Sequence, residues 1–431
     1  MTPNAVEQKV LAAIDADGLV ETLCELIAIP SEGGFETPAQ QRVAALMESF
    51  GMEVDVWDID FDALRRHPAY TAEIERQHGL GVVGGLGRND GPKLILNGHI
   101  DVVPAGEPER WHYPPWRGTL ADGRIYGRGS ADMKGGLCCA LFAARAIFEA
   151  GVELPGRLMI QSVIGEEDGG AGTLAAIERG YCRSGRFGGD AALDAAIIME
   201  PTELMIAPAQ AGAFGFRITV PGLAAHGALR EEGVDPIEKF VPIYSALRAF
   251  ESSRNSNVSD PMFQDYEIPF ALCVGKLQCG IWASTVAEAL VCEGRLGVGT
   301  DEDSMQVRNA FEEKVHEAAA RDTWLTDHPP VVEWTGAQFE PAAIDIDHRI
   351  VTTLGESFRD ATGNNAIVRG MPYGADMRLL VHQGHTPTVL FGPGNVRHAH
   401  APDEFVVVEE LVDATKTLAL AALRFCGGVW Q

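Results

Sequence analysis

Two short patterns of histidine and aspartate lie close together in the first third of the chain, each beside a glycine. His99 is followed two positions later by Asp101, directly after the apolar run 94–96. Asp132 lies within the glycine-rich stretch 127–136. An imidazole can bind a metal ion while a nearby carboxylate holds the ring in the binding tautomer. An aspartate has two oxygens, enough to bridge two ions, so the two patterns predict a metal site.

Further side chains of metal-ligand type each follow a later apolar run. They are Glu166, Glu167, Glu200, His398 and His400. Each run is typical of a strand buried on both faces of a parallel sheet. In open α/β sheets, sites form at the carboxyl ends of the strands. We therefore expect these side chains to gather with His99 at one edge of a sheet.

The number of ligands favours two ions over one. One zinc ion takes about four ligands, whereas the expected set has two histidines and three carboxylates: His99, Asp132, Glu167, Glu200 and His400. Five ligands with a bridging aspartate suit two ions about 3.5–4 Å apart. Glu166, beside a ligand, is then free to accept a proton from the attacking water. Taken singly, His99, Asp101 and Asp132 are equally compatible with a buried histidine and two turn aspartates. The stretch 166–168, in isolation, is more typical of a solvated acidic turn.

The elements that must position these residues alternate along the chain. Strands are expected at the runs 52–57, 94–96, 158–164, 195–199 and 388–391. Helices are expected at residues 4–29 with Asn4 as cap, at 37–51 with Thr37 as cap before Pro38, and at 133–150. Repeated strand, loop and helix predict an α/β sheet with helices on both faces. The stretch 58–90 shows no regular pattern.

These stretches resemble a known family of dinuclear-zinc amidohydrolases and peptidases. The family includes acetylornithine deacetylase, succinyl-diaminopimelate desuccinylase, aminoacylase and glutamate carboxypeptidase. The matching stretches are residues 98–101, 127–136, 165–168, 199–202 and 400–404, which come in the family's order. The resemblance covers nearly the whole chain.

The resemblance implies a role for each member of the set. One zinc ion is held by His99 and Glu200, and the other by Glu167 and His400. Asp132 bridges the two ions, and the peptide bond after it is expected to be cis. His398 competes for the position of the last ligand, but the family pattern selects His400.

Three further roles follow from the same resemblance. Asp101 is expected to orient His99. Glu166 is expected to be the general base and later the proton donor. His226 is expected to reach the active site of the other subunit, where it polarises the scissile carbonyl; the alternative is a histidine that caps a helix or fills a turn.

The pattern of elements changes between residues 211 and 336. The order there is βαββαβ, the ferredoxin-like split unit. We expect residues 1–210 and 337–431 to form a zinc-peptidase-like catalytic domain around a mostly parallel sheet. Residues 211–336 are expected to form an inserted lid and dimerisation domain, which makes the protein a homodimer.

One element of this lid departs from the family. The family usually has an N-x-I-P element that contacts the substrate, but residues 280–288 contain neither the Asn nor the Pro. Trp282, Ser284 and Thr285 are the candidates to replace it. Because of this change, a substrate other than the usual acyl-amino acids is an alternative.

Two arginines are candidates for binding a substrate carboxylate, because the guanidinium fork matches a carboxylate. They are Arg295 and Arg378, and a structural role suits Arg378 equally well. Gly374, close to Arg378, is a further candidate substrate contact. The expected substrate is therefore a small molecule that bears a carboxylate.

Composition limits the other partners. The net charge is −27 with no basic stripe, so nucleic acid is not an expected partner. No apolar run approaches the roughly 20 residues of a membrane-spanning helix, and no signal peptide is visible. None of the eight cysteines forms a C-x-x-C pair, which favours free thiols and a cytoplasmic location.

The predicted function is that of a metal-dependent hydrolase of a C–N bond, with two divalent ions per chain. Zinc is expected, with cobalt or manganese as alternatives. The substrate is expected to be the amide of an N-acyl amino acid, as in acetylornithine deacetylase. A dipeptidase or carboxypeptidase, and an aminohydrolase acting on an aromatic or heterocyclic amine, are the enzymatic alternatives. A metal-binding protein without catalysis is the alternative from another class.

Overall fold

The computed structural model describes residues 3–182 and 194–427 and the backbone of residues 429–430. The chain forms two compact units. The first consists of Met1–Ala209, Ala343–Arg369 and Ala375–Gln431, and the second of Gln210–Ala342 and Gly370–Gly374. The sequence pattern predicts a return to the first domain at residue 337. The second unit extends further because its last strand continues to Phe339.

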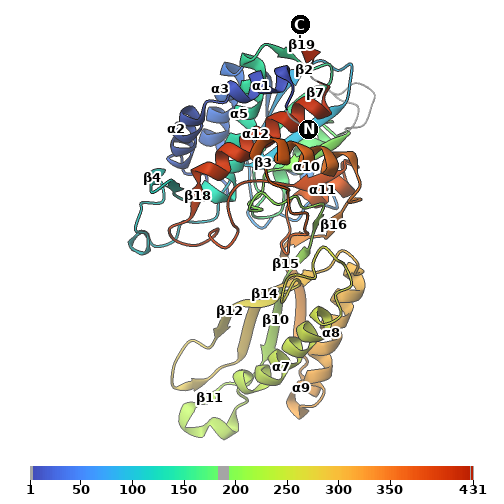
Figure 1. The fold of residues 1–431 in the computed structure, drawn as a ribbon. Helices are drawn as coiled ribbons and strands as arrows, with labels where there is room; N and C mark the ends of the chain where they lie inside the picture. Colours follow the sequence, from blue (N-terminus) through green and yellow to red (C-terminus); the bar gives the residue numbers. More distant parts are fainter. Residues whose placement is uncertain (1–2, 183–193, 428, 431) are drawn as a thin grey trace. The chain divides into compact units, whose positions relative to one another are not determined.

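The first unit is built on a six-stranded sheet of mixed direction (Figure 1). Its strands, in spatial order, are β1 (Glu53–Asp58), β2 (Leu80–Gly87), β7 (Arg157–Val163), β3 (Lys93–His99), β8 (Ala195–Ile198) and β17 (Thr388–Leu390). The four strands from β7 to β17 are parallel, whereas β2 pairs antiparallel with β7, and β1 in turn pairs antiparallel with β2 at the edge. The expected mostly parallel sheet is confirmed.

Helices cover both faces of this sheet. They are α1 (Ala5–Ala12), α2 (Ala16–Ile27), α3 (Thr37–Ser49), α4 (Phe61–Leu64), α5 (Gly135–Glu149), α6 (Ala171–Glu178), α10 (Arg349–Thr362), α11 (Met377–His382) and α12 (Val408–Phe425). In β2, position 84 faces Met47 of α3, whereas position 81, on the opposite face, lies against Trp57. The Trp57 ring lies 5.7 Å from the ring of Tyr181, just after α6. Among the described residues, no helix is both long and apolar enough to cross a membrane.

Two expectations about helix starts were wrong. The helix expected at residues 4–29 is two helices, because Asp15 caps α2 through a hydrogen bond from the Gly18 N–H at 2.9 Å. Asn4 does cap α1, as expected. Thr37 is the first residue of α3, and the cap position is held by Glu36, whose side chain makes no capping bond.

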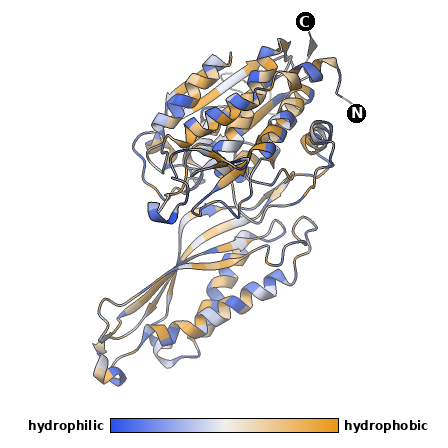
Figure 2. Ribbon diagram, turned by 60° about the vertical axis from the view of Figure 1, so that its left-hand side comes forward, coloured by the Kyte–Doolittle hydropathy of each residue, from blue (hydrophilic) through white to orange (hydrophobic). Residues whose placement is uncertain are grey.

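The four parallel strands of the central sheet are buried along their length. Apolar residues predominate in them (Figure 2). Where they end, polar residues take over. His99 is the last residue of β3, Glu166 and Glu167 follow β7, and Glu200 follows β8. Because these three strands are parallel, their carboxyl ends meet at one edge of the sheet.

Small elements complete the first unit. They are β4 (Thr119–Ala121), β5 (Arg124–Tyr126), β6 (Val152–Glu153), β9 (Ala209–Gln210, which ends in the second unit), β16 (Ala342–Ala343, which begins there), β18 (Phe405–Val407), β19 (Val429–Trp430) and a 3-10 turn at Pro108–Arg110. The strands β18, β5 and β4 form a three-stranded sheet. Pairing of Phe405 with Tyr126 ties the segment after His400 to the strand that precedes the Asp132 turn.

The second unit is a four-stranded antiparallel sheet in the order β12-β14-β10-β15. Its elements are β10 (Gly212–Pro221), β11 (Ala225–His226), a 3-10 turn at Gly227–Glu232, α7 (Pro236–Asn255), β12 (Leu272–Cys279), β13 (Thr285–Val286), β14 (Ala289–Val298), α8 (Ser304–Ala319), α9 (Thr323–Asp327) and β15 (Val331–Phe339). The four sheet strands and two long helices follow one another as βαββαβ, the order expected from the sequence.

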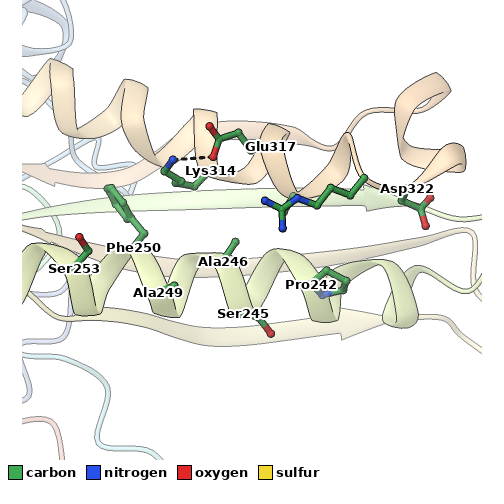
Figure 3. A pocket seen from close by; sticks show the side chains of 11 residues that line it. Pro242, Ser245, Ala246, Ala249, Phe250, Ser253, Lys314, Glu317 and Asp322 are labelled. Carbon is green, nitrogen blue, oxygen red and sulfur yellow. Dashed lines mark hydrogen bonds and ion pairs between the residues drawn. The ribbon is translucent and has the colours of Figure 1, made fainter.

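An aromatic core joins the helices of the second unit to its sheet. The fully buried ring of Phe311 on α8 lies 4.8 Å from that of Phe216 and 5.5 Å from that of Trp334. Outside this core, α7 and α8 border a groove of about 670 Å³ (Figure 3). The Lys314–Glu317 ion pair lies on the α8 side of the groove. None of the predicted metal ligands lines it.

Candidate metal centre

Two groups of potential ligands meet at the carboxyl edge of the central sheet. The first consists of His99, Asp132 and Glu200, whose ligand atoms all lie within 4.8 Å of one another. His99 Nε2 is 3.1 Å from Asp132 Oδ1 and 4.0 Å from Glu200 Oε1. Three donors from three separate segments therefore converge on one volume.

The second group consists of Asp132, Glu167 and His400, within the same limit of 4.8 Å. His400 Nε2 lies 3.0 Å from Glu167 Oε2 and 3.5 Å from Asp132 Oδ2. Asp132 thus belongs to both groups and turns one carboxylate oxygen toward each histidine. His398 belongs to neither group among the described residues, and its ring lies 4.2 Å from that of Phe405.

The Asp132 turn is held by an ion pair that the sequence motifs alone did not indicate. Asp132 lies in the turn Ser130–Lys134, where its own backbone is not helical, and the peptide bond after it is cis, as the resemblance implied. Glu404 Oε1 accepts hydrogen bonds from the N–H groups of Ala131 and Asp132, at 3.0 and 3.1 Å. Its other oxygen, Oε2, pairs with Arg128 at 2.6 Å. Arg128 and Glu404 both lie inside the stretches that match the family. Their place in these stretches was the only sequence signal for a role at the site, and it did not indicate that they pair.

Asp101 contacts the site in a way the sequence did not predict. His99 Nδ1 is hydrogen-bonded to the main-chain carbonyl of Asp101 at 2.8 Å, whereas the nearer carboxylate oxygen is 3.7 Å away. The carboxylate Oδ2 instead accepts the N–H of Glu167 at 3.1 Å. With its Nδ1 hydrogen-bonded to this carbonyl, His99 has Nε2 available for a metal.

The buried carboxylates raise one another's proton affinity. Burial, and then the neighbouring Glu200, raise the pKa of Glu166 well above its usual value. Burial and Asp132 do the same for the pKa of Glu200. Burial opposes protonation of His400, but its hydrogen bonds to Asp132 and Glu167 outweigh this and raise its pKa to about 11. So much buried negative charge suits a site for cations.

Orphaned oxygens support the same conclusion. Glu200 Oε1 and Asp101 Oδ1 are buried and lack a hydrogen-bond partner among the described residues. Buried polar groups are normally paired, and a bound ion is one explanation for an exception. Imidazole and carboxylate donors are the ligands that zinc accepts. The residues present therefore fit two divalent cations that share Asp132.

Glu166 lies beside the first group without belonging to it. Its Oε2 is 3.9 Å from His99 Nε2, and the side chain is buried. A second buried acid, Asp376, was not predicted. Burial raises the pKa of Asp376 to about 6, and its charge acts on both Glu166 and Glu200.

The substrate candidates have main-chain partners. Arg378, in the first unit, is buried and donates from Nη2 to the Gly169 carbonyl at 2.9 Å. Arg295 donates to the Pro372 carbonyl at 3.1 Å within the second unit. The other three candidates, Ser284, Gly374 and His226, also belong to the second unit.

His226 pairs with Thr285 across the short β11–β13 ladder, and its side chain is exposed. Its Nδ1 accepts the Ala228 N–H at 3.1 Å, so the ring caps the 3-10 turn Gly227–Glu232. Ser284 is exposed in the same hairpin and accepts the Gly227 N–H at 2.7 Å through its carbonyl. The helix-capping alternative for His226 therefore has a structural basis.

A mostly parallel α/β sheet that brings carboxylate and imidazole side chains together at its carboxyl edge is typical of a metal-dependent enzyme. Residues 95–424 match the model of peptidase family M20/M25/M40. This chain belongs to that family. The match covers the whole candidate metal centre, from His99 to His400.

Relatives and solved structures agree with this membership. The chain is 30% identical to N-formyl-4-amino-5-aminomethyl-2-methylpyrimidine deformylase of Halalkalibacterium halodurans over 98% of both chains. Its fold matches human carnosine dipeptidase 1 with a TM-score of 0.77, at 18% identity, over 99% of this chain and 100% of that one. A dinuclear metal-binding peptidase of the M20 family from Bacillus subtilis matches with a TM-score of 0.61, at 16% identity, over 95% and 98%.

Proposed function

We propose that this hydrolase removes an acyl group from a small-molecule amine by cleaving the C–N bond of an amide. Family membership makes the chain a metal-dependent hydrolase of such bonds. The observation that carries the mechanism is the sharing of Asp132 between two ligand groups. This sharing supports two cation positions side by side, next to a buried glutamate that neither group uses.

In this proposal His99 and Glu200 hold one ion, Glu167 and His400 hold the other, and Asp132 bridges them. When bound, two divalent ions lower the pKa of water and polarise the amide carbonyl. Zinc is the proposed metal, because imidazole and carboxylate donors such as these would suit it. The similarity to the Bacillus subtilis protein, which is a dinuclear metal-binding peptidase, supports the count of two.

Glu166 is the proposed general base. Its carboxylate takes a proton from the attacking water and returns it to the nitrogen of the leaving amine. Its side chain is buried, with Oε2 3.9 Å from His99 Nε2. Asp101 supports both groups, since its carbonyl orients His99 and its carboxylate holds the main chain of Glu167.

His226 is proposed to donate to the developing oxyanion in the partner subunit. Because Nδ1 accepts the Ala228 N–H, the proton of the neutral ring lies on Nε2. The ring is exposed, so an Nε2–H donor is presented to whatever approaches it. The capping bond and the catalytic role are therefore compatible, since they use different nitrogens.

The homodimer is proposed to form through α7 and β12 of the second unit. Ile237, Val241 and Tyr244 recur at helical spacing on α7 and are 49, 58 and 41% exposed. Strand β12 lies at an edge of the sheet, with Leu277 exposed. A two-fold pair of copies would cover this apolar stripe and the sheet edge together.

Two substrate classes are proposed. The first is an N-acyl amino acid, with Arg295 or Arg378 facing the carboxylate and Ser284 and Gly374 as further contacts. The second is an N-formyl derivative of a heteroaromatic aminomethyl compound, the class named in the Halalkalibacterium halodurans relative. Trp282, 73% exposed where the family element is replaced, favours the second because it offers a ring to stack on a heterocycle.

A substrate panel separates the two classes. N-acetyl and N-formyl amino acids, dipeptides and the formylated aminomethylpyrimidine would be compared by kcat/KM with zinc, cobalt and manganese. A preference for the pyrimidine that falls in a Trp282→Ala variant supports the second class. Turnover of N-acyl amino acids alone supports the first, and no turnover of any amide contradicts the proposed function.

A cytoplasmic location is also proposed. All eight cysteines are free thiols, and disulfides are rare in the reducing cytosol. Fractionation of the native host, with the protein detected by antibody, tests this location.

A further inference from the structure

Three loops that carry or flank the metal centre are joined by hydrogen bonds. The loop after α2 pairs with the segment after His99: the Val102 N–H donates to the Ser31 carbonyl at 3.1 Å. In the same region the Ser31 hydroxyl donates to the Ile100 carbonyl at 2.6 Å, and the Ala105 N–H donates to Glu32 at 3.1 Å. The segment 31–36 and the His99 loop are therefore held together.

Arg76 connects these two segments to the loop that carries Glu166 and Glu167. It lies in the stretch 58–90, where the sequence showed no pattern. Its Nη2 donates to Glu36 Oε1 at 2.7 Å and its Nη1 to Asp168 Oδ2 at 2.7 Å. The Arg76 side chain is fully buried, and both carboxylates are nearly so.

Asp168 is fixed from several sides. Its Oδ2 also accepts the Ile74 N–H at 2.8 Å, and its carbonyl accepts the Glu73 N–H at 2.9 Å. Asp168 directly follows Glu167, so the segment around Arg76 holds the main chain next to a proposed metal ligand. An Arg fork between two carboxylates fixes direction as well as distance.

The two ligand groups depend on this clamp to different degrees. His99 ends strand β3 and Glu200 lies two residues after the end of β8, so regular sheet pairing holds the segments of both residues. Asp132 is held by Glu404. Glu167 lies in a loop whose supports are Asp101 and the neighbouring Asp168. Loss of Arg76 should therefore disturb the second group more than the first.

We propose that Arg76 is a positioning residue for the second metal ion, acting through Asp168 on Glu167. The proposal rests on the proposed function, because it assumes that Asp132, Glu167 and His400 hold an ion. The side-chain hydrogen bonds of Arg76 go to Glu36 and Asp168, which belong to neither ligand group, so its effect is indirect. Loss of a residue that supports a ligand typically lowers metal affinity about 10–100-fold.

A second arginine in the same unit provides a matched control. Arg424 also bridges two carboxylates, with Nε donating to Glu7 at 2.7 Å and Nη2 to Asp360 at 2.7 Å. It joins α12 to α1 and α10, and neither of these two contacts is with a loop that carries a metal ligand. Removal of the Arg424 side chain should destabilise the fold without changing the affinity for either metal ion.

The test is a calorimetric titration of metal-free protein with zinc. Wild type should bind two ions per chain. Arg76→Met should bind the first ion with nearly wild-type affinity and the second about 10–100-fold more weakly. The affinity of Arg76→Lys for the second ion should fall between those of wild type and Arg76→Met, because lysine keeps the charge but not the guanidinium fork. Arg424→Met should bind both ions as wild type does.

Three results would overturn the proposal: wild-type binding of both ions by Arg76→Met, equal weakening of both ions, or the same loss of the second ion in Arg424→Met. If Arg76→Met does not fold, Asp168→Asn, which keeps the side-chain shape, takes its place with the same expectations. Failure of the proposed function looks different, since wild type would then bind no ion in the second group.

Discussion

Glu166 and Glu167 are neighbours in the chain, yet their side chains have different surroundings. Glu167 Oε2 lies 3.0 Å from His400 Nε2, within a ligand group, whereas Glu166 Oε2 lies 3.9 Å from His99 Nε2, outside both. Glu166→Gln should therefore lower kcat about 10²–10⁴-fold, as expected for loss of a general base, while two ions stay bound. Glu167→Gln should lose one ion. The opposite pattern in elemental analysis would reverse the two roles.

The metal-free site should respond to pH. Glu166 and Glu200 have a raised pKa, so the folded state binds more protons than the unfolded state above the usual value of 4.5. The raised pKa of His400, about 11, acts in the same direction. The stability of the metal-free protein should fall as pH rises from about 4.5 toward 11.

Zinc should reverse this loss, because it displaces the protons that the site holds. Thermal unfolding of chelated and zinc-loaded protein across this range checks the prediction. A pH electrode should also record proton release when zinc is added at fixed volume. A metal-free protein that gains stability over the same rise in pH would contradict the account.

At this scale the sequence predicted the residues whose chemistry is local and missed those whose partners are distant. His99, Asp132, Glu167, Glu200 and His400 stand in recognisable motifs. Arg76 stands in an unpatterned stretch, and its partner Asp168 is 92 positions away. Nothing in a linear sequence indicates such a pairing, and the same holds for the Asp101 carbonyl on His99, which involves no side chain of Asp101.

At the scale of elements, apolar runs predicted the buried strands because a strand covered on both faces leaves little room for polar residues. The break between α1 and α2 was missed, since apolar residues recur at helical spacing on both sides of Asp15. The extended backbone of Asp15 and the hydrogen bond that its side chain accepts from the Gly18 N–H separate the two helices. The place of Glu36 at the cap position of α3 was also missed. Its carboxylate accepts a hydrogen bond from Arg76, a tertiary partner, and does not cap the helix.

The core of the second unit gives a prediction for its helices. Phe311 on α8 is fully buried among Phe216, Phe250 and Trp334. Phe311→Ala should destabilise this unit by about 3–5 kcal/mol, the usual cost of such a cavity. Urea unfolding followed by tryptophan fluorescence measures the loss, and the metal content of the folded protein should stay at two.

The matched control for this change is Met305→Ala on the same helix. Met305 is exposed, and exposed substitutions usually change stability by less than about 0.5 kcal/mol. Equal losses for the two variants would show that α8 is not anchored through Phe311. A loss of metal in Phe311→Ala would show that the two units do not fold separately.

At the scale of the whole molecule, the βαββαβ order of the second unit was visible in the sequence, because its half-exposed strands alternate while the central strands do not. The return point was not, since residues 337–342 and 370–374 join the second unit through long-range contacts. Whether two such units pair depends on contacts with a second copy of the chain. A single sequence does not show these contacts.

Subunit mixing tests the role of His226 in the partner's site. Glu166→Ala and His226→Ala homodimers should both be nearly inactive. In a mixed dimer, the His226→Ala chain keeps its own Glu166 and receives His226 from its partner. With random exchange half of the dimers are mixed, and each has one working site, so roughly a quarter of wild-type activity should return. No recovery after exchange verified by mass would place His226 within its own chain's site.

Metal content measured together with activity tests the central claim most directly. The protein would be stripped with a chelator, reloaded with zinc in steps, and assayed on the amide that the panel selects. The account predicts no hydrolysis without metal, two ions per chain at saturation, and full activity on reloading. Full hydrolysis by metal-free protein, or no ion bound at excess zinc, would contradict it.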